Sequence, residues 1–346
     1  MPDLLQFTDK GIYCPRAGVY IDPWKPVERA IISHGHSDHA YAGHQHYLCT
    51  SGAMPVIRHR LYLEDNVIQT LDYGEQQPIN GVNFSFHPAG HIPGSAQVRV
   101  EFRGEVWVFS GDYKLQEDGI STSFEPLRCH VFITESTFGL PVYKWKGQDE
   151  VFRDINEWWI RNKLEGKASV ITGYTLGKSQ RILKNVDASI GKIFTHGAVD
   201  SINKVMRAQG INLPEAPRVH DGIPKEDLKG ALIICPPSAV GSPWVRRFYP
   251  YSLGVASGWM KLRGTRRRRG ADRGFVLSDH ADWNDLNLAI RETRAEKVYV
   301  THGYSEIFSH WLNSQGIESH EVKTRFEGEL GEMAEGGSGG SEEERG

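Results

Sequence analysis

One segment of eleven residues, AIISHGHSDHA at Ala30–Ala40, constrains this chain more than any other. An apolar stretch leads into four side chains that can ligate metals within six residues: His34, His36, Asp38 and His39. On an extended backbone, His34 and His36 point to the same side and can bind one ion. Asp38 and His39 follow where the chain turns, so they can face a second ion. The segment predicts a fold in which a strand ends at a metal centre and the residues after it supply the ligands.

Two ions need further ligands, and residues of the right kind follow other apolar stretches. His91 lies in a glycine-flanked turn, GHIPGSA, and His302 follows the strand-like VYV. Asp112 follows the strand-like EVWVF, where its carboxylate can bridge both ions. His87 is a rival for His91, but His91 has the small neighbours that let a backbone approach a metal.

The apolar pattern predicts an α/β protein. Before residue 140, alternating residues indicate strands over 82–86, 96–102, 105–109 and 129–136. From about residue 150, an amphipathic helix over 149–164 is followed by strands over 168–174, 192–196 and 230–236. Helical stretches over 179–186 and 200–209 separate those strands. Such alternation is typical of a parallel sheet.

The metal-ligand pattern, from Ile21 to about His302, resembles the metallo-β-lactamase superfamily. This resemblance implies an αββα sandwich with the metals at one edge. Glu135 in ITESTFG and His280 in LSDHADW resemble additional motifs of the β-CASP nucleases, whose final histidine matches His302. The strings VASGWMKLRGTRRRRGADRGFVLSDHADW and IDPWKPVERAIISHGHSDHA are similar to bacterial exonucleases associated with DNA ligases.

The resemblance also implies a domain order. Residues 1–144 would form the first part of a metallo-β-lactamase domain and 274–326 its last part. Residues 145–273 would be an inserted β-CASP α/β domain. The segment 327–346 is rich in Gly, Ser and Glu, and we expect it to be a disordered acidic tail.

The resemblance assigns roles to these residues. One ion would bind His34, His36, His91 and Asp112, and the other would bind Asp38, His39, Asp112 and His302. Histidine-rich sites that share a carboxylate suit zinc, with manganese as the alternative. Two such ions activate water and offset the charge of a phosphate. His280 would donate a proton to the leaving 3′-oxygen, leaving a 5′-phosphate product, and Glu135 would orient its imidazole. Asp22 would hold a ligand histidine in place.

The position of His280 between a strand and a helix leaves three interpretations open: a proton donor, a ligand of a third metal site or a structural histidine. The resemblance favours the donor, which together with Glu135 and Asp38 completes the expected catalytic set.

Charge clustering indicates a phosphate-rich partner. The net charge is −3, but the last twenty residues contribute −6, so the rest of the chain carries +3. Lys261–Arg273 holds seven cations and one acid. We expect nucleic-acid contacts from this stretch and from a glycine-containing turn before a helix; the residues are Lys178, Arg263, Arg266, Arg267, Arg268 and Arg269. A solvated surface loop is the alternative. The turn ITGYTLGKSQ is one residue too short for a phosphate-binding P-loop.

Bulk features narrow the function further. Four cysteines lie far apart without a C-x-x-C pair, and no apolar run approaches a membrane span or a secretory signal. We therefore expect a cytoplasmic protein with reduced thiols.

A metal-dependent DNA nuclease, an exonuclease of DNA repair, is the favoured function. Its expected partners are DNA and, by resemblance, a DNA ligase and a helicase. An RNA-processing β-CASP nuclease is the main alternative. A small-substrate metallo-hydrolase would not need the insertion or the arginines, and a non-catalytic binder would not need every ligand.

Overall fold

The computed structural model describes residues 3–262, 264 and 270–330. These residues divide into two compact units. Unit 1 takes in Met1–Glu117, Ser121–Lys144 and His280–Gly328. Unit 2 takes in Asp118–Ile120, Trp145–Asp279 and the chain from Glu329. The α/β class expected from the sequence is confirmed in both units.

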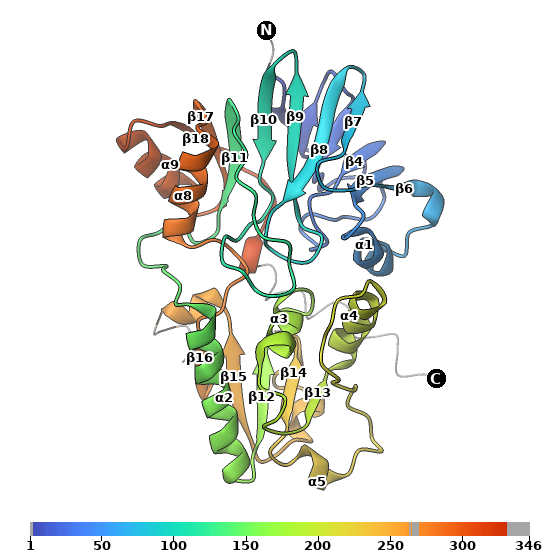
Figure 1. Cartoon of the computed structure of the whole chain (residues 1–346), viewed down its shortest axis with the longest axis vertical. Helices are drawn as coiled ribbons and strands as arrows, with labels where there is room; N and C mark the ends of the chain where they lie inside the picture. The colour runs from blue at the N-terminus through green and yellow to red at the C-terminus, as the bar shows by residue number, and fades with distance from the viewer. Residues whose placement is uncertain (1–2, 263, 265–269, 331–346) are drawn as a thin grey trace. The chain divides into compact units, whose positions relative to one another are not determined.

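Unit 1 is built on two sheets (Figure 1). The six-stranded sheet has the order β1 (Gln6–Phe7), β2 (Ile12–Cys14), β3 (Val19–Ile21), β4 (Arg29–Ile31), β5 (His46–Thr50) and β6 (Ile68–Leu71). The seven-stranded sheet has the order β18 (Glu318–Glu321), β17 (Lys297–Gly303), β11 (Val131–Ser136), β10 (Glu105–Phe109), β9 (Ala96–Phe102), β8 (Val82–Pro88) and β7 (Gln76–Ile79). Strands β9 and β10 begin and end where the alternation of the sequence predicts.

Both faces of the seven-stranded sheet are buried. Along β10, Trp107 and Phe109 pack into a core shared with the six-stranded sheet. Val106 and Val108 point to the opposite face, where they pack with helices α8 (Trp283–Thr293) and α9 (Ser305–Ser314). Helix α1 (Met54–Leu61) and its neighbours cover the outer face of the six-stranded sheet. Unit 1 thus has two facing sheets with helices on both outer sides.

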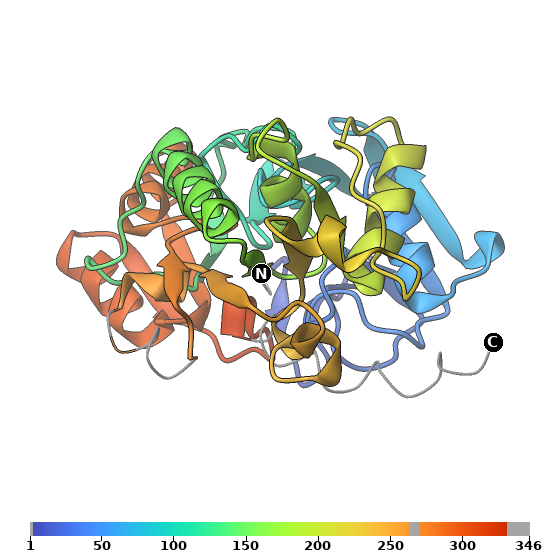
Figure 2. The same ribbon diagram turned by 90° about the horizontal axis from the view of Figure 1, so that it is seen from below.

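Unit 2 contains one five-stranded parallel sheet. Its order is β13 (Ile193–Thr195), β14 (Leu232–Cys235), β12 (Ala168–Thr172), β15 (Tyr251–Ala256) and β16 (Arg273–Phe275). Helix α2 (Gln148–Leu164) packs against β12 and β16; Figure 1 shows it in green along the strands, and Figure 2 shows the same green helix from below. The described residues of this unit also form α3 (Lys178–Asn185), α4 (Gly197–Ala208), α5 (Lys225–Leu228) and α6 (Pro243–Arg246). Short 3₁₀ turns occur at Asp65–Val67, Pro237–Ala239, Gly258–Lys261 and Gly328–Leu330.

Two expectations about boundaries need correction. We expected the inserted domain to end at Arg273, but Phe275 lies in β16, which pairs with β15 inside unit 2. We expected disorder from residue 327, but Gly328–Leu330 forms a 3₁₀ turn and Glu329 is fully buried. Residues 331–346 of the expected tail lie outside the described residues.

Among the described residues, none of the helices combines the length and the apolar composition that a membrane span requires.

Candidate metal centre

The candidate site of unit 1 lies where several strands end. Strands β10, β11 and β17 run parallel to one another, so their carboxyl ends meet at one edge of the sheet. Asp112 follows β10, Glu135 lies at the end of β11, and His302 lies at the end of β17. Because β9 is antiparallel to β10, the turn before β9 brings His91 to the same edge. The segment after β4, in the facing sheet, supplies His34, His36 and His39.

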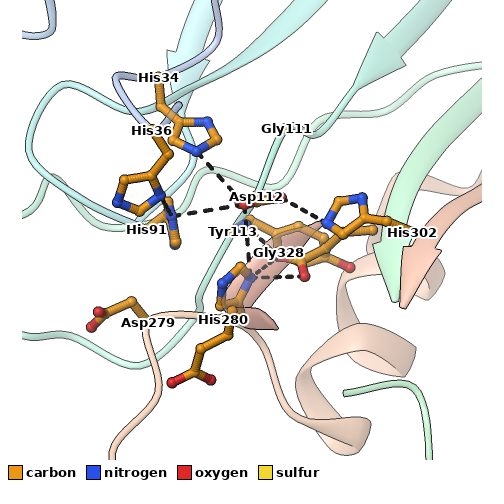
Figure 3. A network of polar contacts seen from close by, with 12 residues as sticks. His34, His36, His91, Gly111, Asp112, Tyr113, Asp279, His280, His302 and Gly328 are labelled. Atoms are coloured by element: carbon orange, nitrogen blue, oxygen red, sulfur yellow. Dashed lines mark hydrogen bonds and ion pairs between the residues drawn. The ribbon is translucent and has the colours of Figure 1, made fainter. Parts of the chain in front are cut away.

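Asp112 lies at the centre of this cluster (Figure 3). Its Oδ2 atom lies 3.6 Å from Nε2 of His34 and 3.9 Å from Nε2 of His91. Its Oδ1 atom lies 3.4 Å from Nε2 of His39 and 3.0 Å from Nε2 of His302. The two oxygens of one carboxylate therefore face two different groups of histidines. His36 joins the Oδ2 group through its Nδ1 atom, which lies 3.0 Å from Nε2 of His91.

Gly111 explains how the chain brings this carboxylate so close to the facing strand. The residue has a φ of 57°, a left-handed conformation that glycine adopts readily. A Cβ atom at this position would lie 3.0 Å from both Cβ and Oγ of Ser33. Ser33 immediately precedes His34, so a glycine is required for the close approach of Asp112 to the histidine segment.

The donor set fits divalent metal ions. Ligand atoms of His34, His36, His91 and Asp112 lie within 4.8 Å of one another, as do those of His39, Asp112 and His302. Both Asp112 oxygens and the Nε2 atoms of His34, His39 and His302 are buried without a well-directed hydrogen bond to any described residue. Such buried polar atoms are costly unless something satisfies them. Imidazole nitrogens around a shared carboxylate are the ligands that zinc and related cations prefer.

Electrostatics hold two of these groups, Asp112 and His34, in the protonation states that a metal needs, whereas for His39 burial is outweighed by the Asp112 and Asp38 carboxylates, which raise its pKa. Burial raises the pKa of Asp112, but the positive charge available on His39, His302 and His280 outweighs it and holds the pKa well below its usual range. Burial, together with the neighbouring His39, holds the pKa of His34 well below its usual range. Asp112 is therefore a carboxylate and His34 is neutral at neutral pH, as ligation requires.

Asp22 holds the histidine segment from behind. Its Oδ2 atom lies 2.7 Å from Nδ1 of His39, and its Oδ1 atom accepts a hydrogen bond of 2.7 Å from the backbone N–H of Ser33. A carboxylate on Nδ1 leaves Nε2 of His39 to face Asp112. The expected contact between Asp22 and a candidate ligand is thus present.

Asp38 differs from the other candidates. It is not grouped with the ligand atoms around Asp112, and its Oδ2 atom lies 3.7 Å from Nε2 of His39. The same oxygen accepts hydrogen bonds of 2.9 and 3.1 Å from the backbone N–H groups of Glu327 and Gly328. The structure therefore places Asp38 beside the cluster, with one oxygen engaged by the backbone.

Glu135 and His280 form a buried pair next to Asp112. Nδ1 of His280 lies 3.1 and 2.9 Å from the two Glu135 oxygens and 4.0 Å from Oδ2 of Asp112. Glu135 also accepts a hydrogen bond of 2.8 Å from the backbone N–H of Tyr113. Ligand atoms of Asp112, Glu135 and His280 lie within 4.8 Å of one another. The geometry accommodates both a positioned acid and a metal ligand.

His87, the rival of His91, has other partners. Its Nδ1 atom lies 3.1 Å from Glu125 and its Nε2 atom lies 3.1 Å from Ser85. His87 lies within β8, whereas His91 lies in the turn that reaches the sheet edge. The structure therefore brings His91, and not His87, to the cluster.

The expected nucleic-acid contact of Lys178 is wrong for the structure as it stands. Its side chain is 2% exposed, and its Nζ atom lies 2.6 Å from Oε1 of Glu329 and 3.8 Å from Oδ2 of Asp279. A buried, paired ammonium group is not presented to a phosphate in solution. The expected contacts Arg263, Arg266, Arg267, Arg268 and Arg269 lie outside the described residues.

Sequence reasoning missed two buried residues near the end of the described chain. Glu329 accepts hydrogen bonds from Gly258 N–H (3.0 Å) and Ser278 Oγ (3.1 Å), within unit 2. Phe326 is 5% exposed, within unit 1, and stacks on His39. The acidic composition after residue 327 indicated a disordered tail, so nothing in the sequence indicated that Glu329 is buried. Phe326, an apolar residue between polar ones, was the one local signal of burial.

No family model matches this sequence. The chain is 30% identical over 334 residues to a protein described as a probable DNA ligase from Opitutus terrae; the match covers 96% of this chain and 32% of that protein. It is 31% identical over 122 residues to the endoribonuclease YSH1 of Saccharomyces cerevisiae, covering 35% of this chain and 15% of that protein. It is 28% identical over 123 residues to the cleavage and polyadenylation specificity factor 73 of Drosophila melanogaster, covering 35% and 18%.

The chain therefore spans a third or less of each of these relatives. Among solved structures, its fold is similar to that of a protein of unknown function from Enterococcus faecalis V583, with a TM-score of 0.57 at 10% identity. That match covers 86% of this chain and 80% of the other. Taken with the histidine and aspartate cluster, the sequence matches relate this chain to the β-CASP nucleases of the metallo-β-lactamase superfamily.

Proposed function

We propose that this protein is a metal-dependent nuclease that hydrolyses phosphodiester bonds of DNA. The observation that carries this proposal is the position of Asp112. Its two oxygens face separate groups of histidines, and this arrangement suits one carboxylate shared by two cations. Two cations at one carboxylate suit the hydrolysis of phosphodiesters, whose charge is the main barrier to attack.

The proposed ligands divide according to the Asp112 oxygens. His34, His36 and His91 would hold one cation with Oδ2, and His39 and His302 would hold the other with Oδ1. Asp38 would join the second group, since its Oδ2 atom lies 3.7 Å from Nε2 of His39. Zinc suits this histidine-rich set, and manganese is the alternative. When bound, the two cations would activate a water molecule and offset the charge of the phosphate.

The residues around the cluster suit the remaining chemistry. His280 would donate a proton to the leaving 3′-oxygen, so that the product carries a 5′-phosphate. Glu135 would accept a hydrogen bond from Nδ1 of His280 and thereby fix the ring, so that Nε2 is the atom that delivers the proton. Asp22 would hold His39 in place through Nδ1.

DNA is favoured over RNA by the extent of similarity. The relative named as a DNA ligase aligns with 96% of this chain, including unit 2, whereas the two RNA-processing relatives align with about a third of it. We therefore propose an exonuclease of DNA repair that works with a DNA ligase and a helicase. An RNA-processing β-CASP nuclease is the second candidate, because one relative with the shorter match is described as an endoribonuclease and another as a cleavage and polyadenylation specificity factor.

We propose a separate role for each of the two units. We propose that unit 1 is a metallo-β-lactamase αββα domain, supported by its two facing sheets and outer helices. We propose that unit 2 is the inserted β-CASP domain, and that the arginines of Lys261–Arg273 contact the nucleic-acid backbone. The role of the arginines rests on the charge clustering of the sequence.

The test is a nuclease assay on end-labelled single- and double-stranded DNA and on RNA of the same sequence. Protein loaded with zinc or manganese should degrade DNA at least about ten times faster than RNA, a difference of about 1.4 kcal/mol in the barrier. Chelation should abolish the activity, and addition of the metal should restore it. A preference for RNA would favour the second candidate, and cleavage that resists chelation would overturn the metal-dependent mechanism.

A further inference from the structure

The segment Phe326–Gly328, here called the strap, contacts one half of the candidate metal centre. It follows the last strand of unit 1, β18, and lies where the sequence indicates the start of an acidic tail. Phe326 is 5% exposed and belongs to the core between the two sheets, whereas the side chain of Glu327 is exposed.

Phe326 packs directly on two of the candidate ligands. Its ring stacks on His39, with centroids 4.3 Å apart and an interplanar angle of 10°. It meets the ring of His302 edge to face, at 5.7 Å and 80°. Its other ring contacts within the described chain are with Trp24 and Phe109. These core contacts anchor Phe326, so its ring restricts the orientation of both imidazoles.

The backbone of the strap engages a third candidate ligand. The N–H groups of Glu327 and Gly328 both donate to Oδ2 of Asp38, at 2.9 and 3.1 Å. Two hydrogen bonds to one carboxylate oxygen hold that oxygen in position. Asp38 thus depends on the strap for its orientation.

Gly328 makes this approach possible. Its φ is 55°, and a Cβ atom there would lie 2.7 Å from Oγ1 of Thr137 and 3.1 Å from Cδ2 of His302. A side chain at this position would therefore strain the backbone and displace His302 or the strap.

The three candidate ligands that the strap contacts all belong to the proposed second group, on the Oδ1 side of Asp112. Among the described residues, the ring contacts of Phe326 do not extend to His34, His36 or His91. We infer that the strap is a positioning element for the second cation only, acting through Asp38, His39 and His302. The inference rests on the proposed two-cation site. It adds that the strap supports the binding of one cation and not of the other.

Metal titration of the full-length protein tests the inference without any activity assay. Metal-free protein is titrated with Zn²⁺ or Mn²⁺ by calorimetry, and metal content is checked by elemental analysis. Wild type should bind two ions. Phe326→Leu should bind one ion as wild type does and the other about 10–100-fold more weakly, the usual effect of removing a residue that orients ligands. Gly328→Ala should have the same effect through His302.

Two matched variants serve as controls. Phe275→Leu makes the same substitution in the core of unit 2 and should leave both affinities unchanged. Glu327→Ala removes an exposed side chain but keeps the N–H that binds Asp38, so it too should bind both ions normally, whereas Glu327→Pro removes that N–H and should weaken the second ion. Circular dichroism of each metal-free variant identifies those that fold.

The outcomes separate this inference from the proposed function. If wild type binds no divalent ion, the metal centre itself is wrong. If wild type binds two ions and the folded Phe326, Gly328 and Glu327→Pro variants bind both equally well, the strap is only part of the core and the inference fails. Equal weakening of both ions would also overturn it, because the strap would then support the whole cluster.

Discussion

Nδ1 of His280 lies 2.9 Å from Oε2 of Glu135, although 144 residues separate the two in the chain. Both side chains are fully buried, and the same imidazole nitrogen lies 4.0 Å from the Asp112 carboxylate. The contact orients the ring toward the candidate metal centre. It also makes the role of His280 testable, since a positioned acid and a metal ligand predict different losses.

Replacing His280 with alanine should retain both metal ions and near-normal DNA binding. Turnover should fall by about 10²–10⁴, the usual contribution of a positioned acid. A nitrophenyl phosphodiester, whose leaving group needs no proton, should recover most of that loss. Glu135→Gln serves as the companion variant and should show a smaller loss with the same recovery. Loss of a metal ion, or equal damage on both substrates, would make His280 a ligand instead.

Asp112→Asn should be the most damaging single change to metal occupancy. The amide carries no charge and offers one oxygen in place of the two that face the separate histidine groups, so one site loses this ligand and the other keeps only a neutral, weaker one. Elemental analysis should return less than one ion per chain, against two for wild type. Asp65→Asn, at an exposed carboxylate paired with Arg58, should keep both ions. Full occupancy in Asp112→Asn would contradict the shared-carboxylate arrangement.

Glu329→Ala should destabilise the protein strongly. The change leaves the buried Lys178 ammonium facing the Asp279 carboxylate at 3.8 Å without the closer Glu329 carboxylate, and breaking such a buried pair costs about 3–5 kcal/mol. Urea unfolding followed by circular dichroism measures the loss. Glu327→Ala, two residues earlier and exposed, should change stability by about 0.5 kcal/mol or less. Equal unfolding midpoints for the two variants would show that the buried pair contributes nothing.

Neutralising the arginine cluster should weaken DNA binding regardless of sequence. Each arginine that no longer binds a phosphate should lower the slope of log affinity against log salt by about 0.7–0.9. The test variant replaces Arg266, Arg267, Arg268 and Arg269 with serine. A control variant replaces four exposed cations elsewhere: Arg103, Lys225, Lys229 and Lys323. If both variants show the same affinity and salt slope as wild type, the cluster is a solvated surface.

His44 should make stability fall as the solution is acidified. Burial lowers the pKa of His44 to about 4, below its ordinary value of 6.5. Between these values the unfolded chain binds the proton and the folded chain does not, so stability rises with pH from about 4 to 6.5 and is lost as pH falls through that window. The contribution is about 2 kcal/mol after allowance for solvent screening. His44→Asn, which keeps an acceptor for Val27 N–H, should flatten this slope relative to wild type. An unchanged slope would contradict the assignment.

Local patterns were sufficient for many elements of the fold. Alternating residues predicted β9 and β10 with their observed bounds, and helical spacing predicted α2 to within one residue. Both signals arise from the periodic burial of side chains along a single strand or helix. They can therefore be read from the sequence without knowing which elements that strand or helix packs against. The metal-ligand types could also be read locally, because four of them fall within six residues after β4.

The sequence by itself determined which side chains were available for a metal centre and which strands could carry them. The residues and the family resemblance led us to expect a shared Asp112 and a contact between Glu135 and His280, but only the tertiary structure gave the geometry of these contacts. The tertiary structure alone decided the stacking of Phe326 on His39. It also buried Lys178 against Glu329, where the sequence had indicated an exposed cation and a disordered tail. These outcomes depend on contacts between residues far apart in the chain, and composition or periodicity within one segment carries no information about its distant partner.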